Sequence, residues 1–273
     1  MQIIILGMHR SGTSVVTRMV NMMGAYVGPE GSLLGFTRDN PKGYWERKDV
    51  IQCNIGLFRL YNATWPNIMN WPLPHRPREL PPQLENDLRT LVMNLDSHRP
   101  WVIKDPRLCL TLPYWKKFLE VPVAVIVYRD PLEIAQSLFM REKDSMAIER
   151  GIALWEYYAI AMLQSSAGMP RVFVSHAEFL QHPVEAAAKF YAALTDHGVQ
   201  GLRLPRSREI TAFIDPALYR SKPSPQNRET YALTKFQQEL AEMLQGKRPV
   251  PATLTLSAES KKQLAQPVAA ATA

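Results

Sequence analysis

The stretch QIIILGMHRSGTS, residues 2–14, opens the chain and decides its fold. Residues 2–6 are mostly apolar and β-branched, which predicts a buried strand. Gly7 and Gly12 bracket a tight turn after it, and apolar residues then recur at helical spacing over 15–23. The stretch therefore predicts a strand, a glycine-bracketed loop and a helix in direct succession.

Strands and helices alternate in the same way along the rest of the chain. Further strands are predicted at 25–27, 101–103, 123–128 and 172–175, with helices at 84–95, from 131 onward, and at 148–162, 184–194 and 231–246. The fully apolar run 123–128 is typical of a parallel sheet that is buried on both faces. We therefore expect an α/β fold: a central, mostly parallel sheet of about five strands, flanked by helices in a three-layer sandwich of the phosphate-binding-loop type.

The 273 residues suit one large domain or two small ones. We expect one main domain over 1–225, a helical extension over 226–248 and a tail over 249–273. Residues 65–82 hold six prolines and two tryptophans, which indicates an irregular loop or a lid. The tail is rich in Ala, Thr, Ser and Pro and has no aromatic residue, which predicts poor order.

Composition excludes several classes of protein. Hydrophobic residues make up 46% and charged residues 21%, which excludes a disordered chain, a collagen-like fibre and a coiled coil. No apolar run approaches the roughly 20 residues of a membrane-spanning helix. The first apolar run has no basic residue before it, so we expect no secretory signal. Two cysteines indicate a reducing compartment, and we expect a cytoplasmic protein. The net charge of +7 suits an anionic ligand.

The loop at 7–14 has the spacing of a phosphate-binding loop. Its glycines let successive backbone N–H groups point inward, and the start of the following helix adds partial positive charge. A nucleoside triphosphatase has lysine after the second glycine, but here that residue is Thr13, and the cation of the loop is Arg10. The alternative is a tight turn between strand and helix that binds no ligand.

The run Arg10-Ser11-Gly12-Thr13-Ser14 resembles the loop with which the sulfotransferase superfamily holds 3′-phosphoadenosine 5′-phosphosulfate. That family also places an arginine at the end of a later strand and a serine in the next helix, both on the 3′-phosphate of the donor. Arg129 follows the apolar run 123–128, and Ser137 lies eight residues further on. Segments 40–46, 104–108 and, more weakly, 213–216 resemble the bacterial branch, and the likeness covers about residues 1–225.

The resemblance implies a donor site and a catalytic domain over 1–225. The donor would be held by Gly7, His9, Arg10, Ser11, Gly12, Thr13, Ser14, Arg129 and Ser137. Sulfuryl transfer needs in-line positioning and stabilisation of charge on the leaving phosphate, a task for Arg10. We expect Lys104, which matches the strand-end lysine of the family, to reach the sulfuryl group. Arg141, one helical turn after Ser137, is expected beside the same site. No metal is expected, because a sulfuryl group carries less charge than a phosphoryl group.

An acceptor hydroxyl also needs a general base. The candidates near the inferred site are His9, Glu30, Glu46 and Asp105. Glu46 is preferred, because the aromatic residues 44–45 before it would shield it and raise its pKa. Glu30 is the alternative, since related tyrosine-directed enzymes carry their base at that place. We expect His9 to anchor the loop and Asp105 to pair with Arg107.

The expected activity is that of a sulfotransferase, which moves a sulfuryl group from 3′-phosphoadenosine 5′-phosphosulfate to a hydroxyl of a carbohydrate or small molecule. One alternative is a nucleotide kinase or triphosphatase, which would need a loop lysine and a Mg²⁺ site. Another is a nucleotide-binding module without turnover. The sequence has no basic helix that would favour a nucleic-acid partner. Candidates for stacking on an acceptor ring are Tyr44, Trp45, Trp65 and Trp71.

Overall fold

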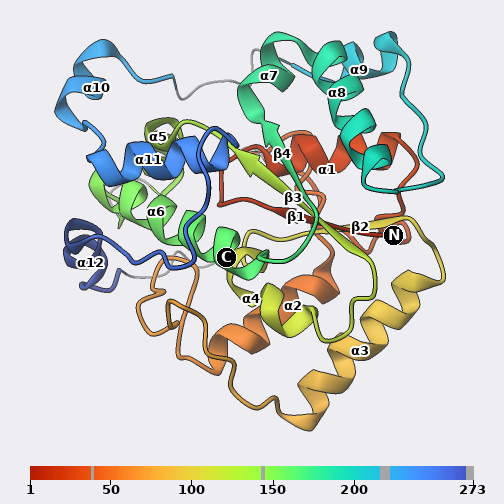
Figure 1. Ribbon diagram of the computed structural model, residues 1–273, viewed down its shortest axis with the longest axis horizontal. Coiled ribbons are helices and arrows are strands. Elements are labelled where there is room, and N and C mark those ends of the chain that lie inside the picture. The colour runs from red at the N-terminus through yellow and green to blue at the C-terminus, as the bar shows by residue number, and fades with distance from the viewer. Residues whose placement is uncertain (38–39, 143–144, 216–221, 269–273) are drawn as a thin grey trace.

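The computed structural model describes residues 1–37, 40–142, 145–215 and 222–268. Their centre is a four-stranded, all-parallel sheet in the order β2-β1-β3-β4 (Figure 1). The strands are β1 (Gln2–Leu6), β2 (Trp101–Lys104), β3 (Pro122–Tyr128) and β4 (Arg171–Ser175). The α/β fold predicted from the sequence is confirmed, with the opening strand in the middle of the sheet.

The predicted strand at 25–27 is reduced to a single bridge. Tyr26 pairs in parallel with Trp101, and its carbonyl accepts a hydrogen bond from the N–H of Val102 at 2.9 Å. This one-residue extension lies at the free edge of β2. Gly24 before it adopts a φ of 113°, so the chain turns sharply into the bridge. The described sheet therefore has four strands rather than about five.

Helices cover both faces of the sheet (Figure 1). One apolar core joins the strands to α1 (Thr13–Met22), α7 (His176–Gln181), α8 (Pro183–Asp196) and α9 (Ser207–Phe213). The other core joins them to α2 (Lys48–Arg59), α3 (Pro82–Asp96), α4 (Leu108–Trp115), α5 (Pro131–Glu142) and α6 (Ile148–Ser165). Residues that alternate along β1 point to the two cores: Ile3 and Ile5 to the first, Ile4 and Leu6 to the second. This period of two is what buries the strand completely.

The proline-rich segment from 65 to 81 contains no helix or strand, and α3 begins at Pro82. The segment packs on the second core, where Ile68 and Trp71 are fully buried. The Trp71 ring lies 4.4 Å from the Tyr61 ring, centroid to centroid. Trp65, Ile68 and Trp71 thus pack this irregular stretch against the second core.

The C-terminal region is more ordered than its composition predicts. After α10 (Pro225–Thr230) and α11 (Lys235–Leu244) the chain forms a further helix, α12 (Ala258–Leu264). Leu254, Leu256 and Leu264 are buried in the second core, where α12 packs on α6. The expectation of a poorly ordered tail is therefore wrong for residues 254–268, because three well-spaced leucines bury enough apolar surface to order it. Residues 269–273 lie outside the described part of the chain.

Candidate active site

A cavity of about 270 Å³ lies at the carboxyl ends of β1, β2 and β3. It is lined by His9, Arg10, Gly12, Thr13, Ser14, Val15, Asn40, Pro41, Lys42, Gly43, Tyr44, Glu46, Lys104, Pro106, Arg129, Ser137, Met140, Arg141, His176, Leu180, Phe213, Ile214 and Asp215. In parallel sheets ligands bind at this edge, where the loops after neighbouring strands converge. A second cavity of about 720 Å³, between α4, the end of α6 and residues 250–253, contains none of the predicted donor-site or catalytic residues.

The glycine loop curls because two of its residues adopt left-handed backbone angles. Gly12 has a φ of 92° and Arg10 a φ of 70°. A Cβ at Gly12 would lie 2.1 Å from Cδ2 of His176, so only glycine fits there. Gly12 is also the N-cap of α1. Because glycine has no side chain, no side-chain hydrogen bond from this residue caps the first N–H groups of the helix. The start of α1 therefore opens into the cavity as a site suited to an anion.

Arg10, Arg129 and Ser137, which the family resemblance assigns to the donor, meet at this loop. The Nε of Arg10 donates to the Ser137 hydroxyl at 2.8 Å, and an Nη of Arg129 donates to the Arg10 carbonyl at 2.9 Å. Arg129 also forms an ion pair with Glu133 one turn into α5, at 2.9 Å. Its side chain is only 8% exposed. Two segments distant in sequence, the glycine loop and residues 129–137, thus place two guanidinium groups and a hydroxyl together in the cavity.

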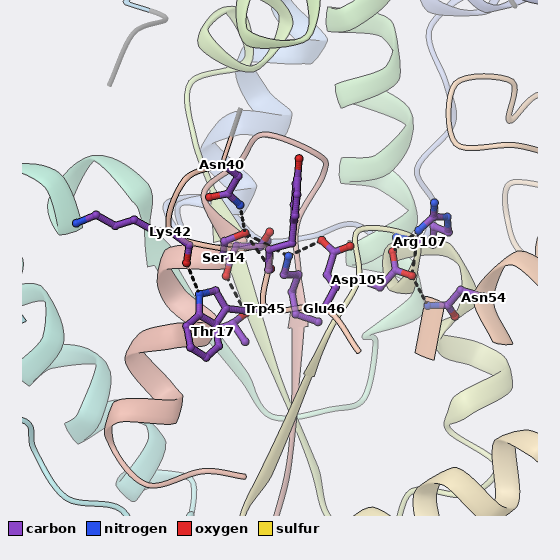
Figure 2. A network of polar contacts seen from close by, with 12 residues as sticks. Ser14, Thr17, Asn40, Lys42, Trp45, Glu46, Asn54, Asp105 and Arg107 are labelled. Carbon is purple, nitrogen blue, oxygen red and sulfur yellow. Dashed lines mark hydrogen bonds and ion pairs between the residues drawn. The ribbon is translucent and has the colours of Figure 1, made fainter. Parts of the chain in front are cut away.

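A second polar network lies beside the start of α1 (Figure 2). The Lys104 ammonium donates to a Glu46 carboxylate oxygen at 2.5 Å and to the Ser14 hydroxyl at 3.3 Å. Ser14 in turn donates to the Tyr44 carbonyl at 3.1 Å and accepts from the Asn40 amide at 3.3 Å. The hydroxyl at the end of the glycine loop therefore joins segment 40–46 to the end of β2.

Burial sets the protonation behaviour of the Glu46–Lys104 pair. The Lys104 side chain is 1% exposed and that of Glu46 is 11% exposed. Loss of water contact raises the pKa of Glu46, and the Lys104 cation opposes that rise. A carboxyl with a raised pKa beside a cation in a cavity has the character of a general base.

Two of the other predicted bases, Glu30 and Asp105, lie outside the cavity. Glu30 is exposed and does not line the cavity. Asp105 is fully buried, where it accepts from the Asn54 amide at 2.9 Å and from the guanidinium of Arg107 at 3.0 Å, as Figure 2 shows. Asp105 therefore has the predicted partner, Arg107. Its carboxylate forms buried hydrogen bonds in the protein interior and does not line the cavity.

His9 points toward the proline-rich segment. Its ring lies 4.7 Å from the Trp65 ring, and its Nε2 is a buried atom without a hydrogen-bond partner. Burial, together with the nearby Arg141 and Arg107, lowers the pKa of His9 well below its ordinary value. His9 is therefore a neutral imidazole that packs in the cavity wall.

The remaining predicted residues are divided between the cavity and the interior. Thr13 lines the cavity, whereas Gly7 and Ser11 are buried in the loop and do not line it. Arg141 lines the cavity near Ser137, as predicted. Of the aromatic candidates for stacking on an acceptor, Tyr44 lines the active-site cavity. Trp71 packs in the second core and lines the second cavity instead.

Sequence analysis missed His176 as a site residue. It opens α7 directly after β4 and packs against Gly12. Burial and the cations of Arg129 and Arg10 lower its pKa to about 3, so it is neutral. Its position after a predicted strand was the available signal, but its packing against the loop depends on the sheet order. Of the weaker motif at 213–216, the first three residues line the cavity and Pro216 is outside the described residues.

No group of three or more His, Cys, Asp or Glu side chains in the described ranges could hold a metal ion. Over the same ranges, no helix is long and apolar enough to cross a membrane.

Comparison with known proteins identifies the family. A model of the sulfotransferase family matches residues 2–196 of the chain. The chain belongs to this family. As a sulfotransferase-family enzyme it belongs to a group that uses 3′-phosphoadenosine 5′-phosphosulfate as donor. No curated protein matches the chain. Among solved structures, the sulfotransferase domain from the curacin biosynthetic pathway aligns with 96% of this chain and 95% of its own, at 14% identity and a TM-score of 0.44.

Proposed function

We propose that the chain transfers a sulfuryl group from 3′-phosphoadenosine 5′-phosphosulfate to a hydroxyl of a carbohydrate or small molecule. The observation that carries this is the convergence of Arg10, Arg129 and Ser137 at one end of a cavity whose other polar network holds Lys104 and Glu46. The first group supplies charge-assisted donors for phosphate, and the second supplies a cation and a base.

The residues fit the donor in chemical terms. The open start of α1 and Arg10 suit the 5′-phosphate, while Arg129 and Ser137 suit the 3′-phosphate. The rival activity of a nucleotide kinase needs a lysine where Thr13 stands. The donor site is therefore best explained by a phosphosulfate with a second phosphate on its ribose.

Transfer would proceed by in-line displacement at sulfur. The acceptor oxygen forms a bond to sulfur as the bond from sulfur to the bridging oxygen of the 5′-phosphate breaks, which leaves 3′-phosphoadenosine 5′-phosphate. Arg10 stabilises the charge that grows on that phosphate. Lys104 donates hydrogen bonds to the sulfuryl oxygens, which weakens its ion pair with Glu46. The Glu46 carboxylate then accepts the proton of the acceptor hydroxyl.

Calorimetry with nucleotides tests this donor assignment. The protein should bind 3′-phosphoadenosine 5′-phosphate at least tenfold more tightly than AMP, a difference of about 1.4 kcal/mol. Ser137→Ala should reduce that preference, whereas the exposed Ser97→Ala on the far side of the domain should keep it. Equal affinities in the unaltered protein would refute the donor, and tighter binding of ATP would favour the kinase. Transfer of radiolabelled sulfuryl to a panel of sugars and phenols then identifies the acceptor.

A further inference from the structure

Trp65, in the proline-rich segment, connects the wall of the active-site cavity to the C-terminal segment, residues 257–268. The Arg141 guanidinium lies 5.0 Å from the centre of the Trp65 ring, and the His9 ring packs against it at 4.7 Å. Both His9 and Arg141 line the cavity. Trp65 therefore supports two residues of the wall from behind.

This wall stands next to the residues assigned to the donor. Arg141 lies one helical turn beyond Ser137, and His9 directly precedes Arg10 in the glycine loop. Both line the same cavity as Lys104 and Glu46, where the acceptor is proposed to react. A displacement of His9 and Arg141 would therefore change the shape of the cavity that the acceptor must enter.

The backbone that carries Trp65 is held from the C-terminal segment. The Asn67 amide pairs with the backbone of Val268 in both directions: Nδ2 donates to its carbonyl at 2.7 Å, and Oδ1 accepts from its N–H at 2.9 Å. The Tyr158 hydroxyl of α6 also donates to the Trp65 carbonyl, at 3.2 Å. The backbone around Trp65 is therefore held both by α6 and, in a reciprocal pairing, by the tail.

Arg150 of α6 joins the same two segments. One of its terminal nitrogens donates to the carbonyls of Gln263 and Gln266, both at 2.7 Å. The other donates to the Pro66 carbonyl at 2.8 Å and to Asn67 Oδ1 at 3.3 Å. The residue is only 5% exposed, so its charge is dispersed over oxygens of the loop and of the tail. The planar fork of arginine suits a bridge of this kind.

The tail has its own anchor, independent of the loop. The buried Glu156 of α6 accepts from the Ser257 N–H at 2.7 Å and from the Ser260 hydroxyl at 2.6 Å. The Gln237 side chain of α11 donates to the same carboxylate at 2.9 Å. The segment from Ser257 is thus fixed to α6 before it reaches Asn67, so it can act as a support and does not merely rest on the loop.

We propose that residues 257–268 support the wall of this active site and so shape the cavity in which the acceptor reacts. They position Trp65 through Asn67 and Arg150, and Trp65 sets the place of His9 and Arg141 in the cavity wall. Asn67 and Arg150 are positioning residues in this arrangement. The match to the family model ends at residue 196, so the support lies outside the matched region. The assignment rests on the proposed transfer reaction.

Two matched pairs of variants test the connection. Asn67→Ala removes the pairing with Val268, whereas Asn70→Ala removes an amide of the same loop that contacts only the Asn62 carbonyl among the described hydrogen bonds. A stop after Ala265 removes the partners of Asn67 and one of those of Arg150, whereas a stop after Val268 keeps them. Thermal unfolding of all four variants reports any general loss of stability.

Hydrogen exchange is the first measurement. Deuterium uptake over residues 64–71 should be about threefold faster or more in Asn67→Ala and in the shorter chain, because local opening becomes easier. The two control variants should match the unaltered protein. Equal uptake in Asn67→Ala and Asn70→Ala would overturn the proposal, and this result does not depend on the identity of the donor.

The second measurement uses 3′-phosphoadenosine 5′-phosphate and the radiolabelled phosphosulfate, with water as acceptor. Water attacks sulfur, the bond to the phosphate oxygen breaks, and inorganic sulfate is released. Affinity for the bisphosphate should stay within about twofold, while sulfate release should rise about threefold as the wall admits water. A matching fall in bisphosphate affinity, or unchanged sulfate release, would overturn this role in shaping the acceptor cavity. Failure of the unaltered protein to bind the bisphosphate would refute the proposed function instead.

Discussion

The Lys104 ammonium lies 2.5 Å from the Glu46 carboxylate, although the two residues are 58 positions apart in the sequence. Lys104 ends β2, and Glu46 closes the loop that precedes α2. Burial of two charges costs free energy that their attraction only partly offsets. A pair of this kind at the edge of a cavity, with the phosphate-loop hydroxyl of Ser14 beside it, is the chemical centre of the proposed transfer.

Replacement of Glu46 by glutamine tests its role as base. Glu46→Gln keeps the shape of the side chain but cannot accept a proton, so the turnover number should fall about a hundredfold or more. Affinity for 3′-phosphoadenosine 5′-phosphate, measured by calorimetry, should change little. Glu30→Gln is the matched control, since that carboxyl is exposed, and it should keep full activity. Normal turnover in Glu46→Gln with loss in Glu30→Gln would transfer the assignment.

The pH dependence of turnover follows from the burial of Glu46. Burial raises the pKa of this carboxyl, and only its ionised form can accept a proton. Turnover should therefore fall as the pH is lowered through the raised pKa, above the range of an ordinary glutamate. A pH profile of the turnover number with the identified acceptor checks this, and the acidic limb should vanish in Glu46→Gln. An acidic limb that persists in the variant would assign the titration to another group.

Arg10→Ala should lower turnover more than donor affinity. The start of α1, Arg129 and Ser137 would still bind the phosphates, whereas stabilisation of the leaving phosphate would be lost, which predicts a fall of about a hundredfold in the turnover number. Steady-state kinetics and calorimetry separate the two effects. The exposed Arg208→Ala provides a control for loss of surface charge. A rise in the apparent Michaelis constant alone would make Arg10 a ground-state binder.

Gly12→Ala should abolish donor binding through a steric clash. The added methyl would lie 2.1 Å from His176, and the left-handed backbone would also become strained. Gly31→Ala separates these causes, because Gly31 has a φ of 82° and nothing within 4 Å of an added Cβ. The control should show only the backbone cost, about 1 kcal/mol in thermal unfolding, with normal donor binding. Equal donor affinity in both variants would contradict the assignment of the loop.

Activity should survive removal of divalent metal ions. A sulfuryl group carries little charge, and Arg10, Lys104 and Arg129 supply cations within the cavity. Transfer assayed in excess EDTA should therefore equal that without it. Loss of activity that Mg²⁺ restores would instead support a nucleotide kinase.

Local sequence signals were sufficient for the four strands of the sheet. The pattern of residues 2–14 predicted strand, loop and helix, because burial of a central strand and the turn at glycine are short-range properties. Arg129 and Ser137 were assigned to the donor through the family resemblance, and the structure brings both to the glycine loop. Parallel strands end at one edge of the sheet, which explains why a residue directly after β3 approaches the loop after β1.

The tertiary structure alone decided the rest, because those features depend on which distant segments pack together. The aromatic residues before Glu46 favoured it over Glu30 in the sequence, but only the fold shows that Glu46 is buried beside Lys104 and that Glu30 is exposed. His176 becomes part of the site because β4 lies next to β3. The tail is ordered because a few leucines and the partners of Glu156 and Arg150 fit the surface of α6. Average composition cannot report such a fit, since it depends on the shape and unpaired polar groups of a surface built by other parts of the chain.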